Sequence, residues 1–247
     1  MTEQRLSSET TGIPSQKDGG ATLLEIAQQP GAWREIAGRG DERAPAFLAD
    51  ILALADLRII LTGAGSSAFA GQIVAPALRR HLGHRVEAIP TTGIVANPAE
   101  HLERETPTLM VSFGRSGDSP ESLATTRLAD ELVDRVWHLI LCCDPDGELP
   151  RAHSGRADSL VVLMPQRTND TGFAMTSSLT SMIVACLLLL GPADRASVGA
   201  LADAAEHIAG RQQDIRTLAA TKRTRFVYLG SGALEGLAAN PRSSCWN

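Results

Sequence analysis

The sequence predicts an α/β fold built on a doubly wound, five-stranded parallel sheet, with helices preceding the sheet. Five short apolar runs rich in β-branched residues alternate with helical stretches, which is the pattern of βαβ units. The near-continuous apolar character of these runs indicates a sheet that helices cover on both faces. The composition agrees, since 43% hydrophobic and 21% charged residues in a chain of 247 are typical of a globular protein and exclude a mostly disordered one.

The predicted elements follow in order along the chain. Residues 1–20 are polar and are expected to form a flexible lead. Apolar residues recur at helical spacing over Ala21–Leu54, which Pro30-Gly31 and Gly40-Asp41 divide into two or three helices. The predicted strands are Arg58–Thr62, Arg85–Ile89, Thr108–Ser112, Val136–Cys142 and Ser159–Met164. The predicted helices between them are Ser67–Leu82, Ser119–Val133 and Glu148–His153.

Two helices are predicted after the fifth strand. Gly172–Leu190 is uncharged, but hydroxyl side chains interrupt its first half, and Met182–Leu190 is only about half of the ~20 residues that a membrane span requires. We therefore expect a buried helix over Phe173–Leu190. Asp194–Thr221 predicts one long amphipathic helix, whose apolar face consists of Leu201, Ala205, Ile208, Ile215 and Leu218.

A partial internal repeat marks the last part of the chain. Arg225–Gly230 predicts a sixth strand, and a Ser/Gly turn and a helix that begins at Ala233 follow it. The same order of strand, glycine turn and small-residue helix occurs at Ile59–Ser67. The sequence thus predicts one domain over residues 21–222 and the start of a second domain over residues 223–247.

Charge and cysteine content exclude several classes of function. The net charge of −5 argues against nonspecific binding to nucleic acid or to an anionic membrane, and 4% aromatic residues offer few platforms for base stacking. The four cysteines form no CxxC pair, and no Cys/His cluster has zinc spacing, so we expect no metal site. Without a signal-peptide pattern in residues 1–20, we expect a reduced, cytoplasmic compartment.

The loop Gly63-Ala64-Gly65-Ser66-Ser67 lies directly after the first predicted strand and opens a helix. Glycines let the backbone turn tightly and point N–H groups at an anion, and a helix N-terminus adds about half a positive charge. The two serines add hydroxyl donors. The loop therefore predicts phosphate binding, and the alternative is a tight turn in which a serine caps the helix.

A dinucleotide site is a competing interpretation of this loop. Gly63-x-Gly65-x-x-Ala68 fits a loose Rossmann pattern, and Glu87 lies near the end of the second strand, where a ribose ligand is expected. A lone G-x-G match is weak evidence for NAD. A second Ser/Gly loop also follows the third strand, and a dinucleotide site does not require one.

This second loop spans Ser112–Ser122 and again joins a strand to a helix. Ser116 and Ser119 are three residues apart, and Pro120 suits the first turn of a helix. In a doubly wound sheet, the loops after neighbouring strands meet at the carboxyl edge. Two serine-lined helix N-termini at that edge predict a pocket for one phosphoryl group, although each serine taken alone is explained by capping.

Together these motifs resemble the sugar isomerase (SIS) domain family. The strand–GxGSS–helix and strand–loop–helix patterns carry the general resemblance. F-G-R-S-G-D-S-P-E-S, T-T-x-x-x-x-N-P at Thr91–Pro98 and G-F-A-M-T-S-S at Gly172–Ser178 are similar to the AgaS-type galactosamine-6-phosphate deaminase/isomerases, also described as tagatose-6-phosphate ketose/aldose isomerases. The resemblance runs from about Leu23 to Ala239. Gly114 stands where many SIS domains have the first serine of S-x-S-G.

The resemblance implies a flavodoxin-like parallel sheet, two SIS domains per chain and a homo-oligomer. It implies aldose–ketose isomerisation of a hexosamine or ketohexose 6-phosphate with loss of ammonia, without metal or cofactor. A non-catalytic sugar-phosphate-binding or regulatory module is the alternative of another class. The residues expected at the phosphate are Gly65, Ser66, Ser67, Arg115, Ser116, Gly117 and Ser119, and those expected near the sugar are Thr176 and Ser177.

The end of the chain predicts a truncated product that is inactive alone. The resemblance places a catalytic glutamate in the helix after the sixth strand and a ring-opening histidine further on, so we expect no catalytic residue here. Pro241 is expected to end the helix that begins at Ala233. Codons can be written for Asn240–Asn247 that, read one base earlier, encode Glu-Ser-Ala-Leu-Lys-Leu-Leu-Glu-Leu, an amphipathic helix.

Overall fold

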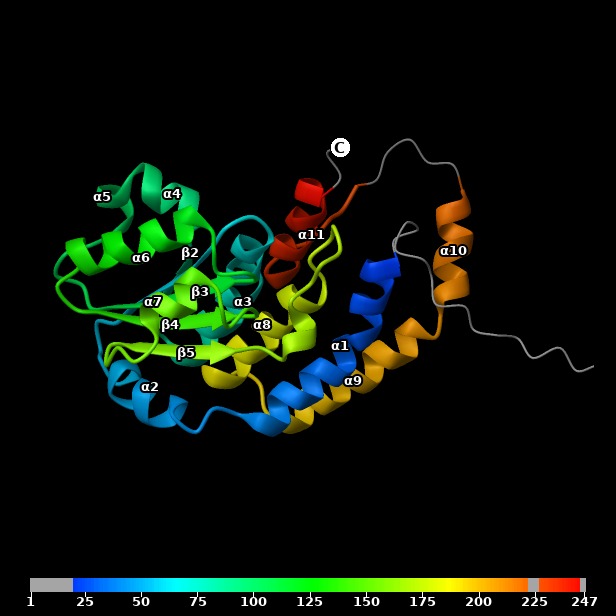
Figure 1. Cartoon of the computed structure of the whole chain (residues 1–247), viewed down its shortest axis with the longest axis horizontal. Helices are drawn as coiled ribbons and strands as arrows, with labels where there is room; N and C mark the ends of the chain where they lie inside the picture. Colours follow the sequence, from blue (N-terminus) through cyan, green and yellow to red (C-terminus); the bar gives the residue numbers. More distant parts are fainter. Residues whose placement is uncertain (1–19, 222–226, 245–247) are drawn as a thin grey trace, which may run out of the picture.

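The computed structural model describes residues 20–221 and 227–244, and it contains the predicted five-stranded parallel sheet (Figure 1). Nearly all of the expected N-terminal lead, residues 1–19, lies outside the described residues. The strands run in the order β2-β1-β3-β4-β5, so the chain reverses direction across the sheet between β1 and β3. Their bounds are β1 Arg58–Gly63, β2 Arg85–Ala88, β3 Thr108–Gly114, β4 Val136–Cys142 and β5 Ser159–Leu163.

Helices cover both faces of this sheet. Every residue of β1 and β3 is buried, and alternate side chains enter different cores. Ile59 and Leu109 contribute to the core shared with α2 (Ala44–Leu52), α3 (Ser66–Leu82) and α8 (Ser177–Leu189). Ile60 and Met110 contribute to the core shared with α4 (Thr91–Ala96) and α6 (Pro120–Leu132). The even-numbered residues of β1 and β3 therefore point toward α4 and α6.

The remaining helices flank these layers. The first, α1, spans Gly20–Arg39 without interruption, so the predicted break at Pro30-Gly31 does not occur. Pro30 lacks the N–H that would bond the carbonyl of Ile26, and Gln29 Nε2 donates to that oxygen instead, at 3.2 Å. The other helices are α5 Pro98–His101, α7 Glu148–His153, α9 Arg195–Ala209, α10 Gln212–Ala220 and α11 Ala233–Ser244, with a short 3₁₀ turn at Gln166–Thr168.

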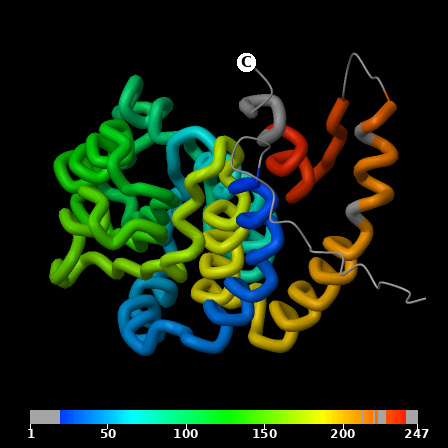
Figure 2. The backbone as a smooth tube through the Cα atoms, turned by 45° about the vertical axis from the view of Figure 1, so that its right-hand side comes forward, coloured from blue at the N-terminus to red at the C-terminus, as the bar shows by residue number. Residues whose placement is uncertain are grey.

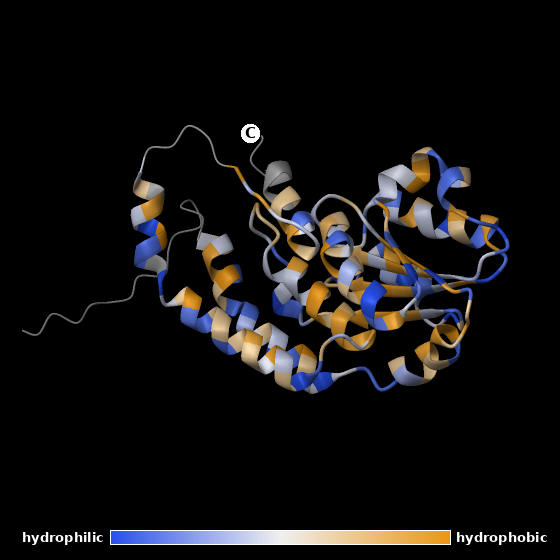
Figure 3. Cartoon of the chain, turned by 180° about the vertical axis from the view of Figure 1, so that it is seen from behind, coloured by the Kyte–Doolittle hydropathy of each residue, from blue (hydrophilic) through white to orange (hydrophobic). Residues whose placement is uncertain are grey.

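The predicted long helix over Asp194–Thr221 is wrong, because the structure has two helices, α9 and α10, separated at Gly210-Arg211. Glycine is a poor helix former, and the last α9 carbonyls are capped by the Gly210 N–H. The predicted apolar face is correct at Ala205 but otherwise misplaced, since α9 packs on α1 through Val198 and Ala202 with Ala205 beside them. Leu201, Ile208, Ile215 and Leu218 are exposed, and α10 extends away from α1 (Figures 2 and 3).

The run with the membrane-like composition forms α8, a helix of 13 residues whose serines and apolar side chains are largely buried. Its burial against α1 and α3 confirms a buried helix here, but the helix begins at Ser177 and not at Phe173, which is 76% exposed. Over residues 20–221 and 227–244, no helix combines the length and the apolar character that crossing a membrane requires.

The predicted sixth strand is not formed in the described part of the chain. Arg225 and Phe226 lie outside the described residues, and residues 227–230 have no regular secondary structure. Val227 and Leu229 are 78% and 89% exposed, and a strand needs a neighbour to accept its hydrogen bonds. No described strand lies beside this segment, which explains why the apolar pattern alone misled the prediction.

The helix α11 packs along α3 (Figure 1). A Cβ on Gly236 would lie 2.9 Å from Cβ of Gln72 and 3.0 Å from the backbone N of Ile73, so the two helices approach closely at a glycine. The helix also continues through Pro241 to Ser244, contrary to the prediction that it ends there. A proline removes one backbone hydrogen bond, and the rest of the helix remains.

Candidate functional site

The two Ser/Gly loops line one pocket of about 310 Å³ at the carboxyl edge of the sheet. The pocket lies where β1 and β3 end, which is the point at which the strand order reverses and where open α/β sheets bind ligands. Its lining residues are Ala64, Ser66, Ser67, Phe113, Gly114, Arg115, Ser116, Gly117, Ser119, Ser122 and Met175. The structure thus brings together Ser66, Ser67, Arg115, Ser116, Gly117 and Ser119 from the two predicted loops.

The first loop depends on two glycines. Gly65 has φ +56°, a conformation that side chains other than glycine disfavour, and α3 begins at the next residue. A Cβ on Gly63 would lie 2.7 Å from Cβ of Ser67, so this position also excludes a side chain. Gly65 is the N-cap of α3 and has no side chain with which to cap it, so no serine hydroxyl occupies that role. Ser66 and Ser67 therefore keep their hydroxyls at the pocket.

The second loop places its serines at the start of α6. Ser119 is the N-cap residue, but its side chain makes no capping bond. Its Oγ donates instead to Oε2 of Glu121 at 2.6 Å, and this hydrogen bond lowers the pKa of the Glu121 carboxyl. The Oγ of Ser116 accepts a hydrogen bond from the N–H of Asp118 at 3.3 Å. Capping thus does not explain Ser119, and two helix N-termini meet at the pocket.

Gly117 fixes the shape of the second loop, and its replacement gives a testable prediction. Gly117 has φ +75°, and an added Cβ would lie 2.8 Å from Cδ of Pro150 and 3.1 Å from Sγ of Cys142. We expect G117A to lower the free energy of unfolding by about 2 kcal/mol, because backbone strain and overpacking both oppose it. Denaturant unfolding measures this loss. G199A is the control, since a Cβ at that helical position meets no atom within 4 Å, and an equal loss in both variants would contradict the prediction.

Arg115 lines the pocket but is held from the side by the loop that precedes α8. Its Nη1 donates to Oδ1 of Asn169 and to the carbonyl oxygen of Asp170, both at 3.1 Å. Asn169 in turn donates to Oδ2 of Asp144 at 3.0 Å. The guanidinium therefore joins the second Ser/Gly loop to residues 169 and 170, more than fifty positions further along the chain.

The carboxylate of Asp170 organises the segment that leads into α8. It is 1% exposed and accepts hydrogen bonds from the backbone N–H groups of Thr176 and Ser178, each at 2.8 Å, and from the hydroxyls of Ser177 and Ser178. Neither Thr176 nor Ser177 lines the pocket, whereas the preceding residue, Met175, does. Ser177 is fully buried, and its hydroxyl bonds to Asp170 instead of facing the pocket.

The helix α1 supports the same segment from the other side. Glu25, only 7% exposed, accepts hydrogen bonds at Oε1 from the N–H groups of Thr171 and Gly172, at 2.7 and 2.8 Å. Gln28 donates to the carbonyl of Arg167 at 2.7 Å and to the Oγ of Ser177 at 2.9 Å. No sequence motif pointed to Glu25 or Gln28, because their partners lie far away in the chain.

Sequence reasoning also did not single out Ser122 and Met175 as pocket residues. Ser122 belongs to a motif used for the family resemblance, and its place one helical turn after Ser119 is the signal that predicts the same orientation. Glu87, the acid of the dinucleotide interpretation, is held by Arg58 Nε at 2.6 Å and Arg85 Nε at 2.9 Å. Its carboxylate is therefore engaged in ion pairs, which argues against the ribose role.

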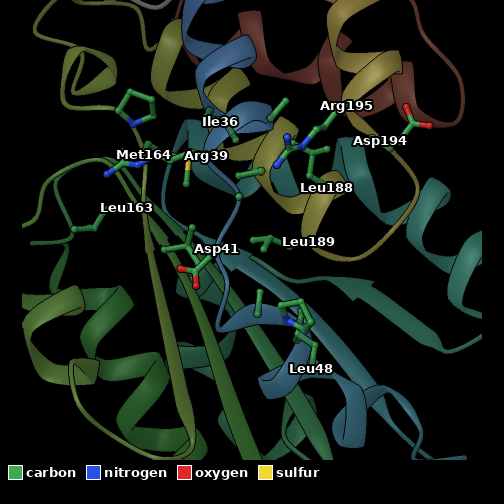
Figure 4. A pocket seen from close by; sticks show the side chains of 18 of the residues that line it. Ile36, Arg39, Asp41, Leu48, Leu163, Met164, Leu188, Leu189, Asp194 and Arg195 are labelled. Carbon is green, nitrogen blue, oxygen red and sulfur yellow. The ribbon is translucent and has the colours of Figure 1, made fainter.

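A larger pocket of about 570 Å³ lies elsewhere, between α2, the ends of α1, β5 and α8 and the start of α9 (Figure 4). Its walls are mainly apolar, with Leu48, Leu163 and Leu188 among them. It contains none of the sequence-predicted site residues. The hydroxyl-rich pocket at the sheet edge is therefore the candidate site.

Comparisons with known proteins show the family to which the fold belongs. A family model described as SIS domain matches residues 51–191, which include both Ser/Gly loops. A Streptomyces coelicolor protein provisionally named D-galactosamine-6-phosphate deaminase AgaS is 52% identical over 224 residues. An Escherichia coli O157:H7 protein named D-galactosamine-6-phosphate deaminase AgaS is 42% identical over 233 residues. Each match covers 88% of this chain, and the chain spans 58% of the length of these curated relatives.

A solved structure shares the fold. The crystal structure of a tagatose-6-phosphate ketose/aldose isomerase from Escherichia coli superposes with a TM-score of 0.87 at 38% sequence identity. The superposition covers 93% of this chain and 64% of that protein. The similarity therefore extends over the helices as well as the sheet, and it again involves only part of a longer protein.

Proposed function

This chain belongs to the SIS domain family, and from that premise we propose that its pocket at the sheet edge binds the phosphate group of a sugar phosphate. The observation that carries the proposal is the convergence of two serine-rich helix N-termini on one pocket. Serine hydroxyls and helix N-termini are ordinary ligands of a phosphate dianion. Gly65, Ser66, Ser67, Arg115, Ser116, Gly117 and Ser119 are the proposed phosphate-binding residues.

The proposed substrate class is a hexosamine or ketohexose 6-phosphate. Relatives at 42–52% identity bear the name D-galactosamine-6-phosphate deaminase, and the structural relative bears the name tagatose-6-phosphate ketose/aldose isomerase. Thr176 and Met175 are on the segment that borders the pocket, so this segment is the proposed sugar side. Ser177 donates a hydrogen bond to Asp170, so its proposed role is to position this segment and not to contact the sugar.

The proposed reaction of the longer relatives is aldose–ketose isomerisation with loss of ammonia, which needs a general base at C2 and an acid to open the ring. Arg115 is the one ionisable side chain among the described residues that line the pocket, and a guanidinium does not give up its proton. The described part of the chain therefore supports binding without a base in place. We assign the base and the acid to regions that the relatives have beyond this chain.

The proposal also assigns the domains. Residues 21–222 form one SIS domain, and residues 223–247 begin a second unit, for which the likeness of Phe226–Leu234 to Ile59–Ser67 is the support. A homo-oligomer is proposed for the two-domain form. Assay of galactosamine 6-phosphate deamination by the 247-residue protein tests the assignment of the base, because a normal enzymatic rate would place it within these residues.

Thermal-shift titration tests the ligand class directly. We expect galactosamine 6-phosphate and tagatose 6-phosphate to raise the melting temperature in a concentration-dependent way, and NAD to leave it unchanged. Stabilisation by NAD alone would replace the sugar-phosphate proposal with the dinucleotide one.

The variant S67A tests the predicted contact. We expect it to bind both sugar phosphates about tenfold more weakly, since it removes one hydrogen bond to a charged oxygen. S154A, which removes an exposed hydroxyl from a residue that does not line the pocket, should bind as the wild type does. Equal affinities of S67A and the wild type would remove Ser67 from the site.

A further inference from the structure

Three hydroxyl side chains belong to the elements that lead into or out of the proposed phosphate pocket. Thr62 is the next to last residue of β1, and Ser112 is paired with it in β3. Both are even-numbered, so both point toward α6, as Ile60 and Met110 do. Ser122 is on the buried face of α6, one turn from its start, and it lines the pocket.

The oxygens of two of these residues are buried without a partner. Thr62 is 1% exposed and Ser112 is 2% exposed, and neither Oγ1 of Thr62 nor Oγ of Ser112 has a hydrogen-bond partner among the described residues. Buried hydroxyls are ordinarily paired, and leaving one unpaired costs free energy. Two such hydroxyls lie near the carboxyl ends of neighbouring strands, just before the loops that line the pocket, and we infer that their partners belong to the ligand-bound state.

We propose that Ser122 is a further phosphate-binding residue and that Ser112 and Thr62 position its hydroxyl from below. This inference rests on the proposed function, because it assumes that the pocket binds a phosphomonoester. Ser122 is 5% exposed, and its Oγ is the hydroxyl of α6 that lines the pocket. A serine that donates its proton to the phosphate keeps oxygen lone pairs, which accept from the hydroxyls behind it.

The arrangement has a further consequence for Ser119. Its proton is donated to Glu121 in this structure, at 2.6 Å, so Ser119 has to turn away from a carboxylate before it donates to phosphate. Among the described residues, the Ser122 hydroxyl donates to no carboxylate. In the proposed ligand-bound state, hydrogen bonds from the hydroxyls of Thr62 and Ser112 to its oxygen strengthen its own donation to phosphate. Ser122 therefore contributes to affinity as much as a residue of the predicted Ser/Gly motif.

Four variants separate a ligand role from a structural one. S122A removes the proposed donor, and S122C keeps the volume with a weaker donor. S112A removes an unpaired hydroxyl below the pocket. T126A is the matched control, because Thr126 is on the same buried face of α6, away from the pocket, and donates to the carbonyl of Leu123 at 3.1 Å.

The probes are inorganic phosphate and galactosamine 6-phosphate, titrated against each full-length protein in thermal-shift and calorimetric experiments. We expect S122A and S122C to bind both probes about tenfold more weakly than the wild type, and T126A to bind them equally well. We expect S112A to bind about threefold more weakly while its ligand-free melting temperature stays the same or rises. A merely structural hydroxyl would lower that temperature and leave affinity unchanged.

The outcomes distinguish phosphate binding by the pocket from the particular role of Ser122. If the wild type binds neither probe, the proposed function fails, and the inference fails with it. If the wild type binds both probes and S122A and S122C bind equally well, only the role of Ser122 is overturned. If S112A melts earlier without any loss of affinity, the positioning role of Ser112 is overturned.

Discussion

Replacement of Asp170 by alanine is expected to lower the free energy of unfolding by about 3–5 kcal/mol. The carboxylate is buried and accepts hydrogen bonds from two backbone N–H groups and two hydroxyls at the start of α8. Its removal leaves these donors unpaired in the interior, and each unpaired donor carries a desolvation cost. The loss is therefore larger than that of a surface acid.

The same change is expected to weaken the pocket. Met175 lines the pocket immediately before the residues that Asp170 holds, and the carbonyl of Asp170 accepts a hydrogen bond from Arg115. When the segment before α8 loosens, both Met175 and the Arg115 guanidinium lose their positions at the pocket. Sugar-phosphate affinity should fall at temperatures where D170A is still folded.

Urea unfolding and thermal-shift titration measure these two effects. D203A is the matched control, because Asp203 has 76% of its side chain exposed and pairs with Arg34 on the surface. Such a pair contributes about 0–1 kcal/mol. If D170A and D203A unfold at the same urea concentration, the network at the start of α8 does not have the role described here.

Acidification from pH 6.5 to pH 4 is expected to remove about 3 kcal/mol of stability through one histidine, His153. Burial, followed by electrostatic interactions with His138 and Arg156, lowers the pKa of His153 to about 4 from an ordinary value of 6.5. Its ring is 1% exposed, lies 4.6 Å from the ring of His138 and bonds through Nδ1 to Oγ of Ser159 at 2.9 Å.

The sign of this pH dependence follows from which state of the chain, folded or unfolded, takes up the proton. Above pH 6.5 His153 is neutral in the folded and unfolded chains, and its contribution to stability is complete. Between pH 6.5 and pH 4 the unfolded chain takes up the proton and the folded chain does not, so the stability falls as the pH is lowered. Asp130 is bonded to His138 and Arg156, and the pKa of its carboxyl is lowered in the folded chain. Its protonation therefore adds a further loss of stability below its ordinary pKa of 3.8.

Denaturant unfolding at half-unit pH intervals measures this dependence. The variant H153Q cannot take up the proton, so its stability should vary less than that of the wild type between pH 6.5 and pH 4. H207Q, which changes an exposed histidine, should keep the wild-type slope. A wild-type slope in H153Q would mean that another group controls the acid transition.

The supporting network around the pocket was beyond sequence reasoning for a physical reason. Glu25 and Thr171 are 146 positions apart, and Arg115 and Asp170 are 55 positions apart. Hydrogen bonds over such separations depend on how α1 and the loop before α8 settle on the sheet. A local pattern of residue types carries no record of that packing, so Glu25, Asp170 and Met175 emerged only from the folded chain.

Local chemistry alone determined the five strands, their burial on both sides and the two glycine–serine loops, because strand periodicity and glycine conformations are encoded over a few residues. Tertiary structure decided the rest. The strand order β2-β1-β3 joins both loops in one pocket, and packing against α1 buries Val198 and Ala202 of α9 while Leu201 and Ile208 stay exposed. The segment 227–230 has a strand-like sequence without a strand, because β structure requires a partner that no local pattern supplies.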